Sequence, residues 1–316
     1  DLQIVTLGAP AGWDTARAVR RLRELDPEAA IDFNHLYLES GVVEPAPAAP
    51  PGASMPSASS AGAVKVGLID GGVETGHPWL KGAAIKAWGC ASTKVPSAHG
   101  TAVASLLVGR APRFRSAAPS ATLYAADVYC NDPIGGSIEA VAAALAWLLG
   151  EQVPVVNISL VGPRNRALEQ VVRRASARGM LLVAAVGNDG PAAAPLYPAA
   201  YPEVVAVSGV DSRGEALLEA GRGPHVAFAA PGSEMAVAAL GDTPFASARG
   251  TSFAAPLVAG LLARSLHQPD AAAAALAVTA LARGATDLGA RGRDVVYGHG
   301  LVARELRTDP AVVAAR

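Results

Sequence analysis

The sequence predicts an α/β protein built around a mainly parallel sheet that helices cover on both faces. Two patterns between residues 64 and 305 lead to this fold class: short continuous apolar runs of strand length alternate with longer, alanine-rich segments of helix length. Strands that are apolar at every position are typical of a sheet buried on both faces. The chain has 316 residues, of which 51% are hydrophobic, so it can build a large core, with about one big domain and a small one.

Composition argues against several classes of function. The formal net charge of −1 gives no support for binding to nucleic acid or to an anionic membrane surface. The longest apolar stretch, around residues 140–149, has about half the length of a membrane span, so we expect no transmembrane helix. The chain begins at Asp1 without a charged-then-apolar leader, so a signal peptide was either removed or never present, and the sequence does not say which.

Residues 1–44 have the pattern of a separate small module. A strand is predicted at residues 3–7, an amphipathic helix at 15–25 and a second strand at 30–38. Such a unit cannot bury enough surface by itself, so we expect it to dock on the rest of the chain. Residues 45–63, rich in Pro, Ala and Ser, are predicted to be a linker.

The main domain is predicted over residues 64–305, with residues 306–316 as a C-terminal tail. Its strands are expected at 64–70, 122–128, 153–160, 180–186 and 204–210, and its helices at 100–108, 137–149, 166–178, 252–266 and 271–282. Ligands of such sheets bind beyond the carboxyl ends of the strands. Polar residues at strand ends and helix starts are therefore the candidates for a functional site.

Four polar residues fall at such positions. Asp70 ends a strand before two glycines, His99 begins a helix, Asn188 lies in a glycine-rich turn, and Ser252 lies in the first turn of a helix that Thr251 is predicted to cap. Each residue has a plain structural explanation when it is considered alone, as a turn or cap residue. Together they supply a nucleophile, a base, an orienting acid and an oxyanion donor.

Three sequence blocks carry a resemblance to a known family. They are Asp70-Gly-Gly-Val73, His99-Gly-Thr-Ala-Val-Ala104 and Gly250-Thr-Ser-Phe-Ala-Ala-Pro256, and in this order they resemble the signature blocks of the subtilases, the subtilisin-like serine proteases. The resemblance covers residues 64–305. It implies a three-layer α/β/α subtilisin-like fold with a small N-terminal α+β segment, and a serine endopeptidase that works through an acyl-enzyme.

The resemblance also implies a role for each candidate. His99 would take the proton from Ser252, and Asp70 would hold the tautomer of the imidazole and stabilise its cation. The side-chain amide of Asn188 and the backbone N–H of Ser252 would form the oxyanion hole.

The chain departs from the family pattern around these residues. Gly71 stands where the family usually has Ser or Thr, and Phe253 stands where it has Met; the other departures are Ala102, Ser105 and Ala255. None removes a member of the triad. Gly71 is the one feature that favours the alternative of a catalytically impaired subtilase acting as a peptide-binding or chaperone-like module. An α/β esterase is a second alternative, opposed by the absence of the G-x-S-x-G elbow and by an acid that precedes the His and the Ser.

In the resemblance, a polypeptide substrate lies as an extra strand between two backbone segments. These segments correspond to Ile134, Gly135 and Gly136 on one side and to Ser159, Leu160 and Val161 on the other. Leu196 would form the floor of the S1 pocket, with Val186 and Gly187 nearby. We expect a shallow apolar pocket and a preference for small apolar P1 residues.

Residues 1–44 resemble the C-terminal part of the family's inhibitory propeptide. The resemblance implies that the chain's own N-terminal segment, through residues 32–38, plugs the cleft, and that the enzyme processes itself. It also implies a secreted or periplasmic protein.

The sequence also bears on a disulfide and on a calcium site, through the two cysteines and the loop at 109–115. Spacing alone leaves Cys90 and Cys130 evenly divided between a disulfide and two buried thiols, and the resemblance, which would put both near the active site, favours the disulfide. The loop at 109–115 carries three arginines and no carboxylate, so we expect no calcium there and no other cofactor.

Overall fold

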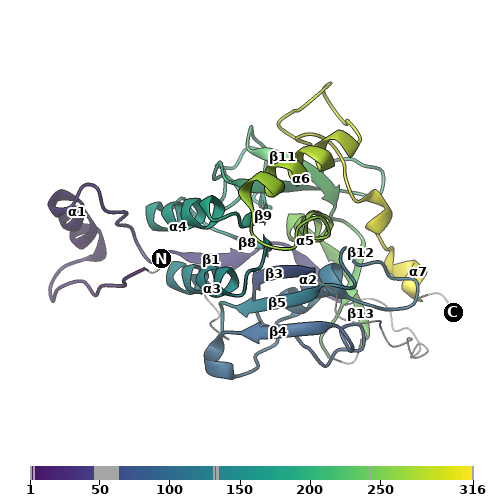
Figure 1. The fold of residues 1–316 in the computed structure, drawn as a ribbon, viewed down its shortest axis with the longest axis horizontal. Helices are drawn as coiled ribbons and strands as arrows, with labels where there is room; N and C mark the ends of the chain where they lie inside the picture. Colours follow the sequence, from purple (N-terminus) through teal and green to yellow (C-terminus); the bar gives the residue numbers. More distant parts are fainter. Residues whose placement is uncertain are drawn as a thin grey trace.

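A seven-stranded sheet lies at the centre of the protein (Figure 1). The structure, a computed structural model, describes residues 2, 4–45, 64–130, 132, 135–241 and 243–314. The strand order is β11-β10-β9-β7-β3-β5-β4, and every neighbouring pair is parallel. The strands are β3 (Lys65–Asp70), β4 (Ala84–Trp88), β5 (Thr122–Asp127), β7 (Val155–Ile158), β9 (Leu181–Ala185), β10 (Val204–Val210) and β11 (Val226–Pro231).

Helices cover both faces of this sheet, which confirms the three-layer α/β/α fold. In β5, Leu123 and Ala125 face one apolar core, whereas Tyr124 and Ala126 face a second core on the opposite side. This alternation follows from the two-residue period of a strand. The first core contains side chains of α2 (Ala98–Val108), α5 (Thr251–Ala263) and α6 (Ala271–Gly284), and the second those of α3 (Ile138–Gly150) and α4 (Arg166–Ala177).

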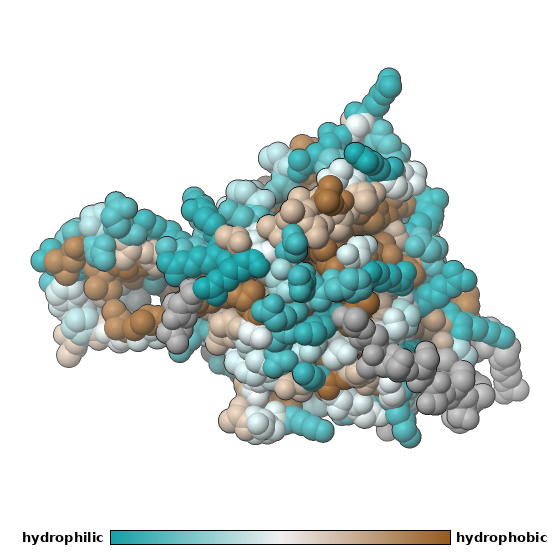
Figure 2. All heavy atoms as spheres, viewed as in Figure 1, coloured by the Kyte–Doolittle hydropathy of each residue, from teal (hydrophilic) through white to brown (hydrophobic). Residues whose placement is uncertain are grey.

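The N-terminal segment carries the predicted helix, α1 (Thr15–Leu25), which stands away from the body of the molecule (Figure 1). Figure 2 shows apolar atoms on this projecting part, where Val5 is 79% exposed and Leu25 64% exposed. The strand predicted at 3–7 is wrong for residues 4–7, which form no regular element. No described strand pairs with them, and an unpaired strand lacks its ladder hydrogen bonds.

Two small antiparallel sheets connect the end of the N-terminal segment to the main domain. β1 (Leu36–Glu39) lies between β6 (Gly136–Ser137) and β8 (Leu160–Val161). Three residues further on, β2 (Val42–Pro45) pairs with β13 (Phe245–Arg249), which also pairs with β12 (Met235–Ala238). Residues 36–45 therefore run along one side of the main domain, held at both ends by strand pairing.

The remaining elements are short. They are η1 (Cys90–Ser92), η2 (Arg304–Leu306) and α7 (Pro310–Ala314), the last of which lies in the predicted C-terminal tail. The predicted linker lies outside the described residues, apart from Pro45 at the end of β2. Within the described part of the chain, every helix is too short or too polar to span a membrane.

Candidate active site

Asp70 and His99 form a buried hydrogen-bonded pair. Asp70 is the last residue of β3, at the carboxyl edge of the sheet, and His99 is the second residue of α2. The imidazole Nδ1 lies 2.9 Å from Asp70 Oδ1 and 3.0 Å from Oδ2. Asp70 is fully buried and His99 is 4% exposed. The backbone N–H of Gly71 also donates to Asp70 Oδ1 over 2.7 Å, which fixes the carboxylate in the orientation that the imidazole requires.

The charge around His99 favours its protonated form. Burial alone would lower the pKa of His99, but the charge of Asp70, the hydrogen bond to Asp70 and the charge of Glu39 outweigh this effect, so the pKa is raised above its usual value. This is the electrostatic arrangement of a base whose cation must be stabilised during a reaction.

Ser252 is the second residue of α5 and is fully buried. Its Oγ donates to the carbonyl of Ser159 over 3.3 Å, and Ser159 Oγ donates in return to the carbonyl of Ser252 over 3.0 Å. His99 Nε2, the atom that would take the proton of Ser252, has no hydrogen-bond partner of good geometry among the described residues. Rotation of the Ser252 side chain about χ1 is therefore required before the hydroxyl can reach the base.

Asn188 connects the glycine-rich turn to the start of α5. Its Oδ1 accepts from the backbone N–H of Thr251 over 3.0 Å, and its Nδ2 donates to Ser40 Oγ over 2.6 Å. The prediction that Thr251 caps this helix is wrong: Gly250 occupies the N-cap with φ 140°, a conformation that favours glycine, and Thr251 is the first helical residue. The hydroxyl of Thr251 instead accepts from the backbone N–H of Gly187 over 3.1 Å.

Phe253, which stands where the family has Met, packs against the base. Its ring centroid lies 5.3 Å from that of His99, and the residue is fully buried. A Cβ placed on Gly41 would lie 2.7 Å from Phe253 Cε2, and Gly41 has φ 136°. The backbone at Gly41 therefore passes too close to Phe253 for any residue other than glycine.

The predicted substrate-binding segments contact β1. Leu36 and Tyr37 pair with Ser137 and Gly136. On the other side of β1, Leu38 pairs with Val161 and Glu39 pairs with Leu160. A Cβ on Gly135 would lie 2.6 Å from the carbonyl oxygen of Tyr37, so this segment too is in close contact with β1. Ile134 lies outside the described residues.

Tyr37 is the most deeply buried side chain of β1. It is 1% exposed, and its hydroxyl donates to the carbonyl of Pro163 over 2.6 Å. A Cβ on Gly162 would lie 2.9 Å from the tyrosine ring. Tyr37 therefore anchors β1 to the main domain.

A cavity of about 730 Å³ adjoins the end of β1. Leu196 and Val161 line it, together with Asn188 and residues 38–41. Val186 and Gly187 are not among its described lining residues: Val186 is 2% exposed in the core, and Gly187 lies behind Leu196, whose Cδ1 a Cβ on Gly187 would touch.

The cysteines and the histidine–carboxylate cluster are the candidate metal ligands. Cys90 and Cys130 form a disulfide between η1 and the end of β5, so their sulfurs are not thiolate ligands. Ligand atoms of Glu39, Asp70 and His99 lie within 4.8 Å of one another. Because Asp70 already holds Nδ1 of His99 by hydrogen bonds, we assign this cluster to acid–base chemistry.

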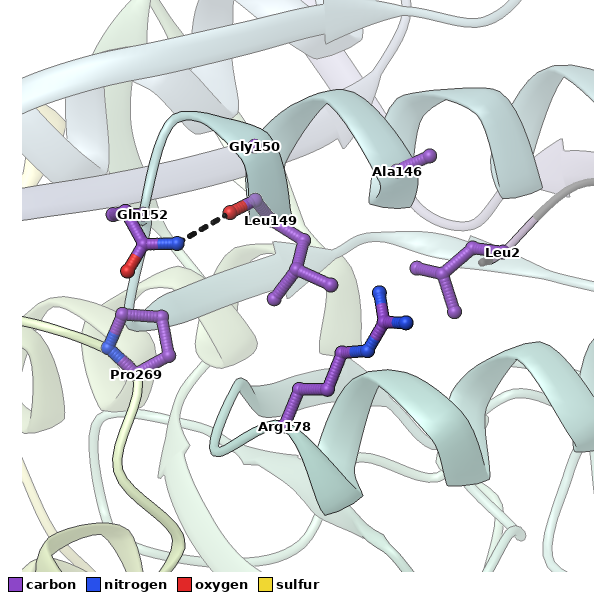
Figure 3. Close-up of a pocket in the computed structure, with 7 residues that line it drawn as sticks. All are labelled: Leu2, Ala146, Leu149, Gly150, Gln152, Arg178 and Pro269. Carbon is purple, nitrogen blue, oxygen red and sulfur yellow. Dashed lines mark hydrogen bonds between the residues drawn. The ribbon is translucent and has the colours of Figure 1, made fainter.

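A second cavity, of about 400 Å³, lies away from these residues between the ends of α3 and α4 (Figure 3). Leu2 of the N-terminal segment, Leu149 of α3 and Arg178 border it, and the hydrogen bond drawn in Figure 3 joins Gln152 Nε2 to the carbonyl of Leu149 over 3.1 Å. Among the described residues that line it, Arg178 is the only ionisable one. These residues therefore do not include the acid, base and nucleophile types that lie at the edge of the sheet.

Comparisons with known proteins identify the family of this chain. Residues 61–300 match the subtilase family, and the chain belongs to that family. Its class of activity is that of a serine endopeptidase.

Individual relatives match most of the chain. It is 36% identical to subtilisin BL of Lederbergia lenta over 78% of this chain and 90% of the relative. It is 31% identical to minor extracellular protease Epr of Bacillus subtilis (strain 168), over 80% of this chain and 40% of the relative. The solved structure of patellamide maturation protease PatA is 27% identical, with a TM-score of 0.66, over 77% of this chain and 94% of that one.

Several residues near the site were not predicted from the sequence. Ser97 is the N-cap of α2, and its Oγ accepts from the backbone N–H of Gly100 over 2.8 Å. Its position shortly before the helix predicted at 100–108 was a usable signal for a cap. Glu39 and Ser40 carried no such signal, because the pairing that brings them to Asp70 and Asn188 links distant parts of the chain.

Proposed function

We propose that this chain hydrolyses peptide bonds with Ser252 as nucleophile, His99 as general base and Asp70 as the residue that orients and stabilises the imidazole. The buried Asp70–His99 pair and the raised pKa of His99 support these roles. After rotation, Ser252 Oγ attacks the carbonyl carbon, and His99 takes its proton and later delivers it to the leaving amine. The Asn188 amide and the backbone N–H of Ser252 stabilise the oxyanion.

The chain's own residues 36–45 act as the first substrate. The single observation that carries this proposal is the antiparallel pairing of β1 with both β6 and β8, because an added strand is a recurring mode of peptide recognition. In this register Glu39 faces Leu160, so Ser40 comes opposite Ser159, whose Oγ donates to the carbonyl of Ser252. The Asn188 amide donates to Ser40 Oγ over 2.6 Å. The bond to be cleaved is Ser40–Gly41.

The same register supports a preference for small P1 residues. Ser40 is the P1 residue in this proposal and is 6% exposed. Leu196, as the apolar floor of the adjoining cavity, favours small apolar side chains at the same position. A peptide library that returned lysine, arginine or large aromatic P1 residues would contradict this preference.

Intact-mass measurement of the full chain tests self-processing. The unchanged protein should yield a fragment that begins at Gly41, whereas Ser252→Ala should remain intact under the same conditions. Ser265→Ala, at an exposed position after α5, is the matched serine control and should be processed like the unchanged protein. Equal cleavage of Ser252→Ala, or cleavage at another bond, would contradict the proposal.

The alternative of an impaired, peptide-binding subtilase has one structural feature in its favour, since Ser252 bonds to Ser159 and not to His99. A fluorophosphonate probe separates the two readings. Labelling that disappears in Ser252→Ala identifies an active nucleophile, and absence of labelling after release of the N-terminal segment identifies the impaired form.

We further propose that the protein is secreted or periplasmic. The Cys90–Cys130 disulfide supports this, because disulfides persist in oxidising compartments. The relative Epr is itself an extracellular protease by name, which points the same way. Fractionation of cells that express the protein from its natural gene would check the location.

A further inference from the structure

Gly71, the residue after the catalytic aspartate, leaves a space that two other side chains fill. A Cβ placed on Gly71 would touch Ser97 Oγ, and it would lie 2.8 Å from Ser97 Cβ and 3.1 Å from Glu39 Oε1. A Ser or Thr at this position, which is the usual family pattern, would therefore collide with Ser97. The absence of a side chain at Gly71 is what allows the hydroxyl of Ser97 and the carboxyl group of Glu39 to meet beside Asp70.

Ser97 has a hydrogen available for this carboxyl group. Its Oγ already accepts from the backbone N–H of Gly100 over 2.8 Å, as the cap of α2, so its own O–H remains free to donate. A hydrogen bond from Ser97 lowers the pKa of Glu39. Ser97 thus acts both as the cap of the helix that carries His99 and as a donor to the side chain of Glu39.

The charges around Glu39 oppose one another. Burial and the charge of Asp70, with a smaller contribution from Asp127, raise the pKa of Glu39, while His99 and Ser97 partly offset this rise. The contact with Ser97 requires only an oxygen that accepts a hydrogen bond, which a carboxylate, a carboxylic acid and a carboxamide all provide.

We propose that Gly71 and Ser97 make this protease selective for a P2 side chain that has the length of glutamate and ends in a hydrogen-bond-accepting oxygen. The inference rests on the proposed function, in which Ser40 is the P1 residue and Glu39 therefore the P2 residue. Selectivity arises because a methionine of similar length would place an apolar end against the Ser97 hydroxyl and offer it no oxygen that accepts a hydrogen bond.

The inference can be tested with four fluorogenic peptides of the sequence Tyr-Leu-Xaa-Ser-Gly-Val, where Xaa is Gln, Glu, Met or Ala. The enzyme is the protein produced as the full chain and used after release of its N-terminal segment. The Gln and Glu peptides should each have a kcat/KM about tenfold above that of the Met peptide, as one satisfied hydrogen bond predicts. The Ala peptide is the reference for the chemistry itself. Equal kcat/KM for the Gln, Glu and Met peptides would overturn the inference, and cleavage of the Ala peptide would still support the proposed function. If no peptide were cleaved, both the inference and the proposed function would be overturned.

Two variants test whether Ser97 and Gly71 cause the selectivity. Ser97→Ala removes the donor and should bring the Gln-to-Met ratio close to one, even if weaker capping of α2 reduces every rate. Gly71→Ala should do the same by displacing Ser97. Because each ratio compares two peptides on one enzyme, general damage to the active site cancels. A Gln-to-Met ratio that stayed near ten in Ser97→Ala would overturn the inference, whether or not Gly71→Ala folds.

Discussion

Asn188 Nδ2 donates a hydrogen bond to Ser40 Oγ over 2.6 Å, which joins the glycine-rich turn after β9 to the segment that crosses the active site. We expect Asn188→Ala to reduce kcat by about 10²–10³-fold, because the oxyanion loses a preorganised donor; this magnitude comes from subtilisin itself. Steady-state kinetics with a short peptide would measure the effect. A change mainly in KM would show that the amide binds substrate and does not stabilise the transition state.

The hydrogen bond between Gly187 N–H and Thr251 Oγ1 links the glycine-rich turn after β9 to α5. Thr251→Val should lower the free energy of unfolding by about 1–3 kcal/mol, because it leaves the buried N–H of Gly187 without its acceptor. Thr251→Ser keeps the hydroxyl and is the matched control, with stability close to that of the unchanged protein. Urea denaturation would compare the three proteins. A Thr251→Val variant as stable as the unchanged protein would show that this hydrogen bond does not stabilise the fold.

The pH dependence of self-processing should follow the raised pKa of His99. Protonated imidazole cannot accept a proton from Ser252, so the rate should fall as the pH drops through this pKa, which lies above the usual 6.5. Because the charge of Glu39 helps to raise it, Glu39→Gln should move the acid limb to lower pH. Cleavage rates of both proteins between pH 5 and 9 (about two units to each side of neutrality) would measure the limb. An unmoved limb in Glu39→Gln would exclude a role for this charge.

The disulfide between Cys90 and Cys130 closes a loop with a sequence separation of 40. Replacement of both cysteines by serine should lower the free energy of unfolding by about 2–4 kcal/mol, mainly because the unfolded chain gains freedom. Denaturation with and without dithiothreitol would check this. The reductant should destabilise the unchanged protein and leave the double variant unaffected; the same effect on both would rule out the disulfide as its target.

The loop after α2 should bind no calcium. Residues 109–115 carry no carboxylate, and Arg110 Nε donates to the carbonyl of Pro119 over 2.9 Å, so a cation fills the space that oxygen ligands would need. We expect the melting temperature to be the same with EDTA and with added CaCl₂. A lower melting temperature in EDTA that calcium restored would show a site, here or elsewhere in the chain.

Much of the fold was predictable because its signals are local. The runs at residues 122–128 and 204–210 are mainly apolar, and the corresponding β5 and β10 are buried on both faces. α1 has the predicted bounds, since its apolar period and its Asp14 cap are both local features. β12 and β13 were missed because they are short and owe their structure to pairing with each other and with β2.

The candidate site was likewise predictable from the sequence only in part. The order and the local settings of Asp70, His99, Asn188 and Ser252 were readable from the sequence, because each residue lies at the end of an element that its neighbours define. By contrast, Thr251 was assigned the cap, because its hydroxyl suits that role. Only the structure revealed that this hydroxyl accepts from Gly187, a residue 64 positions away.

By itself, the sequence determined the α/β class, the chain order of the reactive residues and the departures at Gly71 and Phe253. The tertiary structure decided what those departures accomplish: Gly71 makes room for Glu39 and Ser97, and Phe253 lies over Gly41. The physical reason is that β1 and β2 form long-range antiparallel pairs. Such pairing depends on the completed edges of the main domain, and no local pattern of residues encodes it.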